Sequence, residues 1–142
     1  MIKEKKEFKV SVVIPTYNRV PYLGRAITSV LKQSYPINEI IVIDNGSTDQ
    51  TLSFIKKKFN SIRVIIEKKR GVSFARNLGI KNCKYNWIAF LDSDDEWITD
   101  KIEKQFILFT RRCAATGCCC YNDWNLDTSC SSATRCATSL PL

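Results

Sequence analysis

An apolar segment that runs directly into a cluster of acidic residues constrains this chain more than any other feature. The segment is Trp87-Ile88-Ala89-Phe90-Leu91, and four of the five residues at 92–96 are acidic. Several carboxylates at one strand end repel each other, and a bound divalent cation removes that cost. Oxygen ligands suit Mg²⁺ or Mn²⁺. A metal of this kind beside a sheet usually accompanies a phosphate-bearing substrate, so the pattern predicts a nucleotide-dependent enzyme or a part of one.

Apolar runs and amphipathic segments alternate along the first 112 residues. The apolar, β-branched runs predict strands at 10–14, 39–43, 62–66 and 86–91. Apolar residues at helical spacing predict helices at 20–33, 49–58, 73–82 and 100–111. Strands that are apolar on both faces, with helices between them, indicate an α/β fold whose mostly parallel sheet is covered on both sides.

Polar segments follow three of the four predicted strands. Pro15 is expected to end the first strand, and Tyr17 follows it closely. The second strand leads into a turn in which Ser47 or Thr48 can cap the next helix. The acidic cluster follows the fourth strand. Because ligands of parallel sheets bind beyond the carboxyl ends of the strands, these segments are expected to form one site.

The residue types in these segments suit a nucleotide. A base could stack on Tyr17 while Thr16 or Asp44 reads its edge by hydrogen bonds. Asp94 and Asp95 could hold the ribose and a metal that bridges two phosphates.

Four sequence blocks carry a resemblance to a known family. They are Pro15-Thr16-Tyr17-Asn18-Arg19, Ile43-Asp44-Asn45-Gly46-Ser47-Thr48-Asp49, the block at 71–80 and Phe90-Leu91-Asp92-Ser93-Asp94-Asp95. In order and spacing they resemble the family 2 glycosyltransferases, which have the GT-A (Rossmann-like) fold. The resemblance covers residues 8–111, the nucleotide-sugar-binding half of that fold. It implies metal-dependent transfer of a sugar from a nucleotide-diphosphate sugar, expected to be UDP-linked, to a hydroxyl acceptor.

The same resemblance implies roles for individual residues. Thr16 and Tyr17 would line the base pocket, Asp44 would contact the uracil or ribose, and Arg76 would lie near the diphosphate. Asn45 stands where the family often has a second Asp. The residues implied to bind the nucleotide sugar are Thr16, Tyr17, Asn18, Arg19, Asp44, Asn45, Arg76, Asp92 and Asp94.

The acidic cluster resembles the DxD motif of the family at Asp92-Ser93-Asp94. Asp94 and Asp95 are implied to hold the metal, for which Mn²⁺ or Mg²⁺ is expected. The metal would act as a Lewis acid on the leaving diphosphate.

The composition changes sharply near Arg112. Residues 1–112 hold 21 of the 22 basic residues and one cysteine, whereas residues 113–142 hold six cysteines and one arginine. The irregular cysteine gaps and the lack of histidine argue against a zinc site, and a disulfide framework would need an oxidising compartment. We therefore expect two regions: a GT-A nucleotide-sugar-binding region at 1–112 and an atypical Cys-rich tail at 113–142, which is out-of-frame or disordered.

In the family, the acceptor-binding half should follow Arg112. It includes a carboxylate that deprotonates the acceptor hydroxyl in inverting members. Asp123 and Asp127 stand in a different context, so no catalytic residue is assigned. The chain is thus expected to be a truncated form that has a donor site and no acceptor site. The alternative function is that of a non-catalytic nucleotide-sugar-binding module.

Two other classes of α/β protein fit the sequence less well. A phosphate-signalling receiver would need an acidic pair after the first strand, where this chain has Pro15-Thr16-Tyr17. A Rossmann dehydrogenase would need a Gly-x-Gly-x-x-Gly motif after that strand, and none is present.

The formal net charge of +8 bears on partners and location. The clusters Lys56-Lys57-Lys58 and Lys68-Lys69-Arg70 are interpreted as solvated surface, and since no aromatics interleave with them, nucleic acid is not an expected partner.

The chain shows no secretory signal and no apolar run of membrane-spanning length, so a cytoplasmic location is expected. The basic surface is compatible with peripheral association at the inner face of the membrane. The family resemblance also implies a partner for the protein, namely a glycan or lipid-linked acceptor, as in surface polysaccharide biosynthesis.

Overall fold

The structure is a computed structural model that describes residues 8–116, with side chains described for residues 8–110. The chain divides into two compact units, Met1–Ile102 and Glu103–Leu142. The first unit contains the sheet and the helices that cover it, and it carries the features that bear on function. The second contains most of the last helix.

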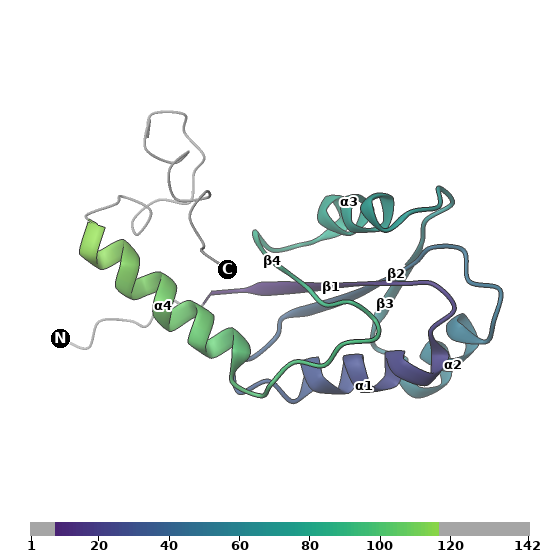
Figure 1. Cartoon of the computed structure of the whole chain (residues 1–142), viewed down its shortest axis with the longest axis horizontal. Helices are drawn as coiled ribbons and strands as arrows, with labels where there is room; N and C mark the ends of the chain where they lie inside the picture. The colour runs from purple at the N-terminus through teal and green to yellow at the C-terminus, as the bar shows by residue number, and fades with distance from the viewer. Residues whose placement is uncertain (1–7, 117–142) are drawn as a thin grey trace. The chain divides into compact units, whose positions relative to one another are not determined.

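The first unit is built on a parallel sheet of four strands in the order β3-β2-β1-β4 (Figure 1). These are β1 (Val10–Thr16), β2 (Glu39–Asp44), β3 (Arg63–Ile66) and β4 (Trp87–Phe90). The central strand β1 is buried along its whole length, as its β-branched residues predict for a strand covered on both faces. The α/β prediction with a parallel sheet is confirmed.

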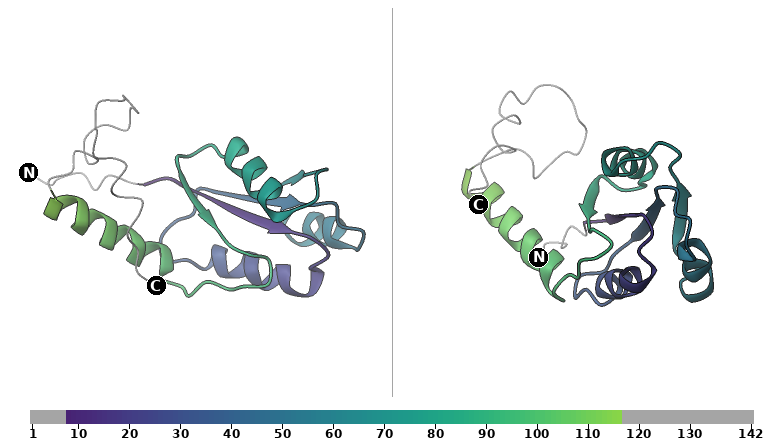
Figure 2. Two further views of the ribbon diagram at one scale, coloured as in Figure 1. Left: turned by 45° about the horizontal axis from the view of Figure 1, so that its top comes forward. Right: turned by 45° about the vertical axis from the view of Figure 1, so that its right-hand side comes forward.

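Helices cover both faces of this sheet (Figures 1 and 2). Helices α1 (Val20–Leu31) and α2 (Thr51–Lys58) lie on one face, and α3 (Val72–Asn82) lies on the other. The buried side chains of α1 recur at helical spacing and include Leu23, Ile27 and Val30. The buried face of α3 is formed by small residues instead, Ala75 and Gly79, so this helix approaches the strands closely.

Strand β1 continues through Pro15 to Thr16, so the prediction that Pro15 ends the strand is wrong. Proline cannot donate a ladder hydrogen bond and is therefore confined to places where a neighbouring strand is missing. Pairing with β4 stops at Val13, whereas pairing with β2 continues to Thr16 opposite Asp44. Pro15 thus lies where the strand has only one neighbour, and the extension brings Thr16 to the carboxyl edge.

Helix α2 begins at Thr51, and its N-cap residue is Gln50. The prediction that Ser47 or Thr48 caps this helix is therefore wrong. The Asp49 carboxylate accepts hydrogen bonds from the backbone N–H (2.9 Å) and the hydroxyl of Thr51. Burial, the largest single influence, would raise the pKa of Asp49, but hydrogen bonds from Thr51 and from the backbone N–H groups of Val20 and Asp49 together lower that pKa. The ionised Asp49 therefore contributes stability above the ordinary pKa of an aspartate, and this contribution is lost as the pH falls through the lowered pKa.

Helix α4 (Lys101–Thr116) continues across the composition change at Arg112. Helix ends depend on tertiary context, which the pattern of a single helix does not contain. The other predicted element boundaries lie within one or two residues of the observed ones. Most of the predicted Cys-rich tail, residues 117–142, lies outside the described residues. None of the helices in the described part of the chain is both long and apolar enough to cross a bilayer.

Candidate functional site

A cleft of about 510 Å³ lies at the carboxyl edge of the sheet. It is lined by the end of β1 and the residues after it, by Asn45 after β2, and by residues 92–94 after β4. Five residues just before and at the start of α3 complete the lining: Arg70, Gly71, Val72, Ala75 and Arg76. The predicted convergence of the first, second and fourth strand ends is therefore observed. The segment before α3 joins them, which the strand pattern alone did not indicate.

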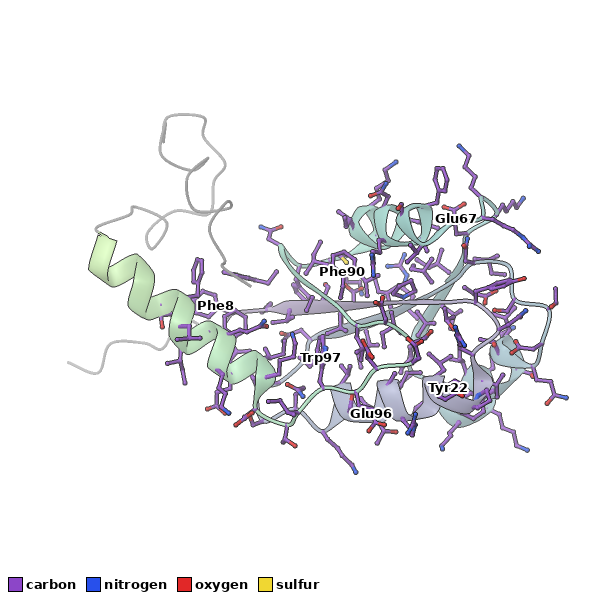
Figure 3. All side chains as sticks on the ribbon, viewed as in Figure 1. Phe8, Tyr22, Glu67, Phe90, Glu96 and Trp97 are labelled. Carbon is purple, nitrogen blue, oxygen red and sulfur yellow. The ribbon has the colours of Figure 1, made fainter. Side chains whose placement is uncertain are left out.

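Backbone hydrogen bonds hold these segments in register at the edge. The N–H of Asn45 donates to the carbonyl of Thr16 at 2.9 Å, which continues the β1–β2 ladder past its last pair. On the other side of β1, the N–H of Leu91 donates to the carbonyl of Val13 at 3.1 Å. Figure 3 shows Phe90 at the end of β4 and Glu67 on the segment that leads into α3.

One part of the cleft combines a buried hydroxyl with an exposed aromatic ring. Thr16 is only 3% exposed, and its Oγ1 is buried without a hydrogen-bond partner among the described residues. Tyr17 is 42% exposed, and the Arg70 guanidinium lies 5.3 Å from the centroid of its ring. A buried hydroxyl without a partner is costly, and the exposed ring next to it in the sequence is suited to stack on a planar group.

Arg70 is a cleft residue that sequence reasoning missed. The sequence predicts a solvated surface for Lys68, Lys69 and Arg70, because a run of basic residues in a loop does not indicate which side chain points toward the sheet edge. The available signal was its position immediately before Gly71, whose φ of 130° favours glycine and turns the chain into α3.

The charged residues of the cleft are paired across elements. Arg76 of α3 donates from Nη2 to Asp92 Oδ1 at 2.7 Å, while Arg19 Nη2 lies 4.0 Å from Asp94 Oδ2. The cleft lining contains three arginines and two aspartates, Arg70 being the third arginine. The lining therefore has a net positive formal charge, which favours an anionic ligand.

Asn45 fastens the segment before α3 to the end of β2. Its Nδ2 donates to the carbonyls of Glu67 (3.3 Å) and Lys69 (2.7 Å), and its Oδ1 accepts from the N–H of Gly71 (2.7 Å). The amide thus uses both its donor and its acceptor capacity on backbone groups. Asn45 lines the cleft and positions the Arg70–Gly71 side of it, and its contact with the nucleotide sugar stays a prediction.

Two of the predicted binding residues do not line the cleft. Asp44 is 1% exposed, and its carboxylate accepts from the N–H of Ser47 at 3.2 Å and from the Ser47 hydroxyl. Asn18, at φ 50°, accepts at Oδ1 from the N–H groups of Thr48 (2.8 Å) and Asp49 (3.3 Å). Asn18 thus joins the loop after β1 to the loop after β2, whereas Asp44 bonds within its own loop. A direct contact of either with the nucleotide stays a prediction.

The predicted metal pair, Asp94 and Asp95, is divided between two hollows. Asp94 lines the main cleft with Asp92, whereas Asp95 lines a smaller hollow of about 230 Å³ with Glu96 and Trp97. Arg76 and Asp92 border both. Figure 3 shows Glu96 and Trp97 on the segment that follows β4. A role for Asp95 at the metal remains a prediction.

The donor set of the cleft fits a metal that arrives with phosphate. Among the described residues, no group of three or more His, Cys, Asp or Glu side chains is placed to hold a metal ion. Magnesium sites in phosphate-handling enzymes typically use only one or two carboxylates and complete the shell with substrate phosphates and water. Asp92 and Asp94 supply that number at the cleft.

Comparison with known proteins agrees with this architecture. The family model for glycosyl transferase family 2 matches residues 11–128. An uncharacterized glycosyltransferase of Rickettsia felis is 52% identical over 99 residues, which are 68% of this chain and 16% of that protein. The Escherichia coli UDP-Glc:alpha-D-GlcNAc-diphosphoundecaprenol beta-1,3-glucosyltransferase WfgD is 37% identical over 108 residues, covering 74% of this chain and 42% of WfgD.

A solved structure supports the same fold. Staphylococcus aureus TarS 1-349 in complex with UDP superposes with a TM-score of 0.65 at 30% identity, over 73% of this chain and 32% of that one. The chain belongs to the family 2 glycosyltransferases, and the predicted GT-A fold class is confirmed. It spans less than half the length of the curated relatives cited above.

Proposed function

We propose that the cleft binds the nucleotide diphosphate of an activated sugar, with UDP as the nucleotide, and forms the donor site of a glycosyltransferase that acts on a hydroxyl acceptor. The observation that carries this proposal is the buried, unpartnered hydroxyl of Thr16 beside the exposed ring of Tyr17 in an arginine-rich cleft. Membership of the family supports it, as do the UDP complex of TarS and the UDP-Glc donor named for WfgD.

In this proposal each side of the cleft has one task. The Tyr17 ring stacks on the base, and the Thr16 hydroxyl bonds to its edge, so the nucleoside is fixed at the end of β1. The guanidinium groups of Arg19 and Arg76 bind the diphosphate and stabilise the charge that grows on it as the sugar leaves. No residue in the described part of the chain is assigned as the acceptor base.

Asp92 and Asp94, which resemble the DxD motif, would hold Mn²⁺ or Mg²⁺ together with the diphosphate. When bound there, the metal supplies Lewis-acid stabilisation of the leaving diphosphate. A lipid-linked glycan is the proposed acceptor class, since WfgD is named for a diphosphoundecaprenol-linked one. With it we propose a cytoplasmic location at the inner face of the membrane and a part in surface polysaccharide biosynthesis.

Thr16→Val tests the donor site, because valine keeps the shape of threonine and removes its hydroxyl. Since Oγ1 has no partner in the protein, the free energy of unfolding should be unchanged or higher. The affinity for UDP in the presence of Mn²⁺ should fall about two- to tenfold, the loss of one ligand hydrogen bond. Isothermal titration calorimetry measures the affinity, and urea denaturation measures the stability.

Thr28→Val is the matched control, because the Thr28 hydroxyl bonds only to the carbonyl of Gly24 within α1, at 2.7 Å. It should leave UDP affinity unchanged. Chelation of the metal with EDTA should lower the affinity of the wild type to that of Asp94→Asn. A folded wild-type chain that fails to bind UDP with Mn²⁺ would overturn the proposed function.

A further inference from the structure

The two acidic side chains that face the cleft each have an arginine as counterion. Arg76 reaches Asp92 from α3, at 2.7 Å, and Arg19 approaches Asp94 from the loop after β1, at 4.0 Å. These are the same four groups that the proposed donor site assigns to the diphosphate and to the metal. Each carboxylate that lines the cleft therefore has a guanidinium group as its neighbour in the structure.

These pairs are well placed to be exchanged. The side chains of Arg76 and Asp92 are 39% and 47% exposed, and those of Arg19 and Asp94 are 49% and 52% exposed. Ion pairs between groups this exposed are weak, because solvent and salt screen them. The Nε of Arg76 is also buried and has no hydrogen-bond partner among the described residues, so its contact with Asp92 through Nη2 is the hydrogen bond that holds this guanidinium.

We propose that the metal and the nucleotide diphosphate enter this cleft by exchanging counterions: the diphosphate takes Arg76 and Arg19 from the aspartates, and the freed carboxylates of Asp92 and Asp94 take the metal. The inference rests on the proposed donor site and adds that the binding of the metal and the binding of the diphosphate depend on each other. Two internal ion pairs are replaced by guanidinium–phosphate and carboxylate–metal contacts, so each of these four charged groups exchanges one counterion for another.

The exchange makes the two ligands cooperative. A metal that binds alone must displace a guanidinium from Asp92, and a diphosphate that binds alone leaves two carboxylates facing its own negative charge. Each ligand removes the obstacle to the other, so UDP should raise the affinity for Mn²⁺ and Mn²⁺ should raise the affinity for UDP by the same factor. Arg76 is then a residue that suppresses metal binding until the nucleotide is present.

Arg76→Gln separates this exchange from simple phosphate binding. Without UDP, the variant should bind Mn²⁺ about two- to fivefold more tightly than the wild type, the range expected for release of one exposed ion pair. Its affinity for UDP should fall, and the factor by which UDP and Mn²⁺ assist each other should shrink. The electron paramagnetic resonance signal of free Mn²⁺ measures metal binding, and calorimetry measures UDP binding.

Two controls make the result specific. In the Asp92→Asn background, Arg76→Gln should leave Mn²⁺ affinity unchanged, because the carboxylate that it releases is gone. Arg25→Gln removes the same charge from a pair with Glu96 (3.3 Å) outside the main cleft and should also leave Mn²⁺ affinity unchanged. Arg19→Gln, alone and in the Asp94→Asn background, tests the second ion pair in the same way. These variants replace the first set if an Arg76 variant does not fold.

The outcomes separate the two proposals. If the wild type binds UDP with Mn²⁺ but Arg76→Gln does not gain Mn²⁺ affinity, or gains it equally without Asp92, the exchange is wrong and the donor site stands. If the folded wild type binds no UDP in the presence of Mn²⁺, both proposals are overturned.

Discussion

Gly79→Ala is expected to destabilise the protein and to weaken nucleotide binding together. A Cβ built on Gly79 would overlap Cγ1 of Val13 and lie 3.1 Å from its Cγ2. Val13 is fully buried on the central strand and has a stiff, β-branched side chain, so it cannot turn aside without strain. Overpacking of this kind typically costs about 1–3 kcal/mol of unfolding free energy, which outweighs the usual gain from replacing glycine within a helix.

The effect on binding follows from what α3 carries. Ala75 and Arg76 lie one turn before Gly79 and line the cleft. A helix pushed away from β1 would therefore move them. Urea denaturation and UDP titration of the same variant measure both effects.

Val13→Ala tests whether the overlap with Val13 causes the destabilisation expected for Gly79→Ala. It should destabilise the wild type by opening a cavity, yet it should make room for the alanine at position 79. The double variant is therefore expected to be more stable than the sum of the two single effects. Strictly additive effects would show that the contact between Gly79 and Val13 does not set the position of α3.

Asn45→Ala is expected to release the segment that leads into α3. The substitution removes three hydrogen bonds and leaves the carbonyls of Glu67 and Lys69 and the N–H of Gly71 without their partner. Leaving buried polar groups unpaired costs about 1–3 kcal/mol each, and water can recover part of this at a partly exposed loop. UDP affinity should fall by about tenfold or more, because Arg70 and Gly71 line the cleft.

Hydrogen exchange should report the same change as faster exchange of the amides at 67–71. Asn82→Ala is the matched control, since Asn82 bonds to Leu78 within α3 and to Arg63, and it does not line the cleft. It should leave UDP affinity unchanged. Wild-type UDP affinity in Asn45→Ala would show that the segment before α3 does not contribute to the site.

The sequence predicted the strand ends because their chemistry is local. A buried apolar run followed by polar residues identifies where a strand leaves the sheet, and parallel strands bring their carboxyl ends to one edge. Thr16, Tyr17 and Asp94 were placed at the cleft on this basis, and the structure has them there. The extension of β1 past Pro15 escaped prediction because it depends on where the neighbouring strand β4 stops.

The side-chain assignments within the rim could be predicted only in part. An aspartate after a strand serves equally well as a ligand or as a turn-forming group, and Asp44 takes the second role with Ser47. Arg70 shows the reverse case, since a basic loop residue is directed into the cleft by the fastening of its segment through Asn45. Whether a loop side chain points into the cleft or forms a turn depends on contacts between loops that are distant in sequence. The residue pattern of one sequence does not contain those contacts.

The most direct test of the donor site is to map where UDP binds on the ¹⁵N-labelled chain in the presence of Mg²⁺, by amide chemical-shift changes. Binding at the carboxyl edge should shift the amides of Thr16, Tyr17, Gly71, Val72 and Ser93, which line the cleft from three separate segments. Amides at the opposite ends of the strands, such as Ser11 and Ile40, should stay unchanged. Shifts confined to other surfaces, or none at saturating UDP on a folded chain, would contradict the account.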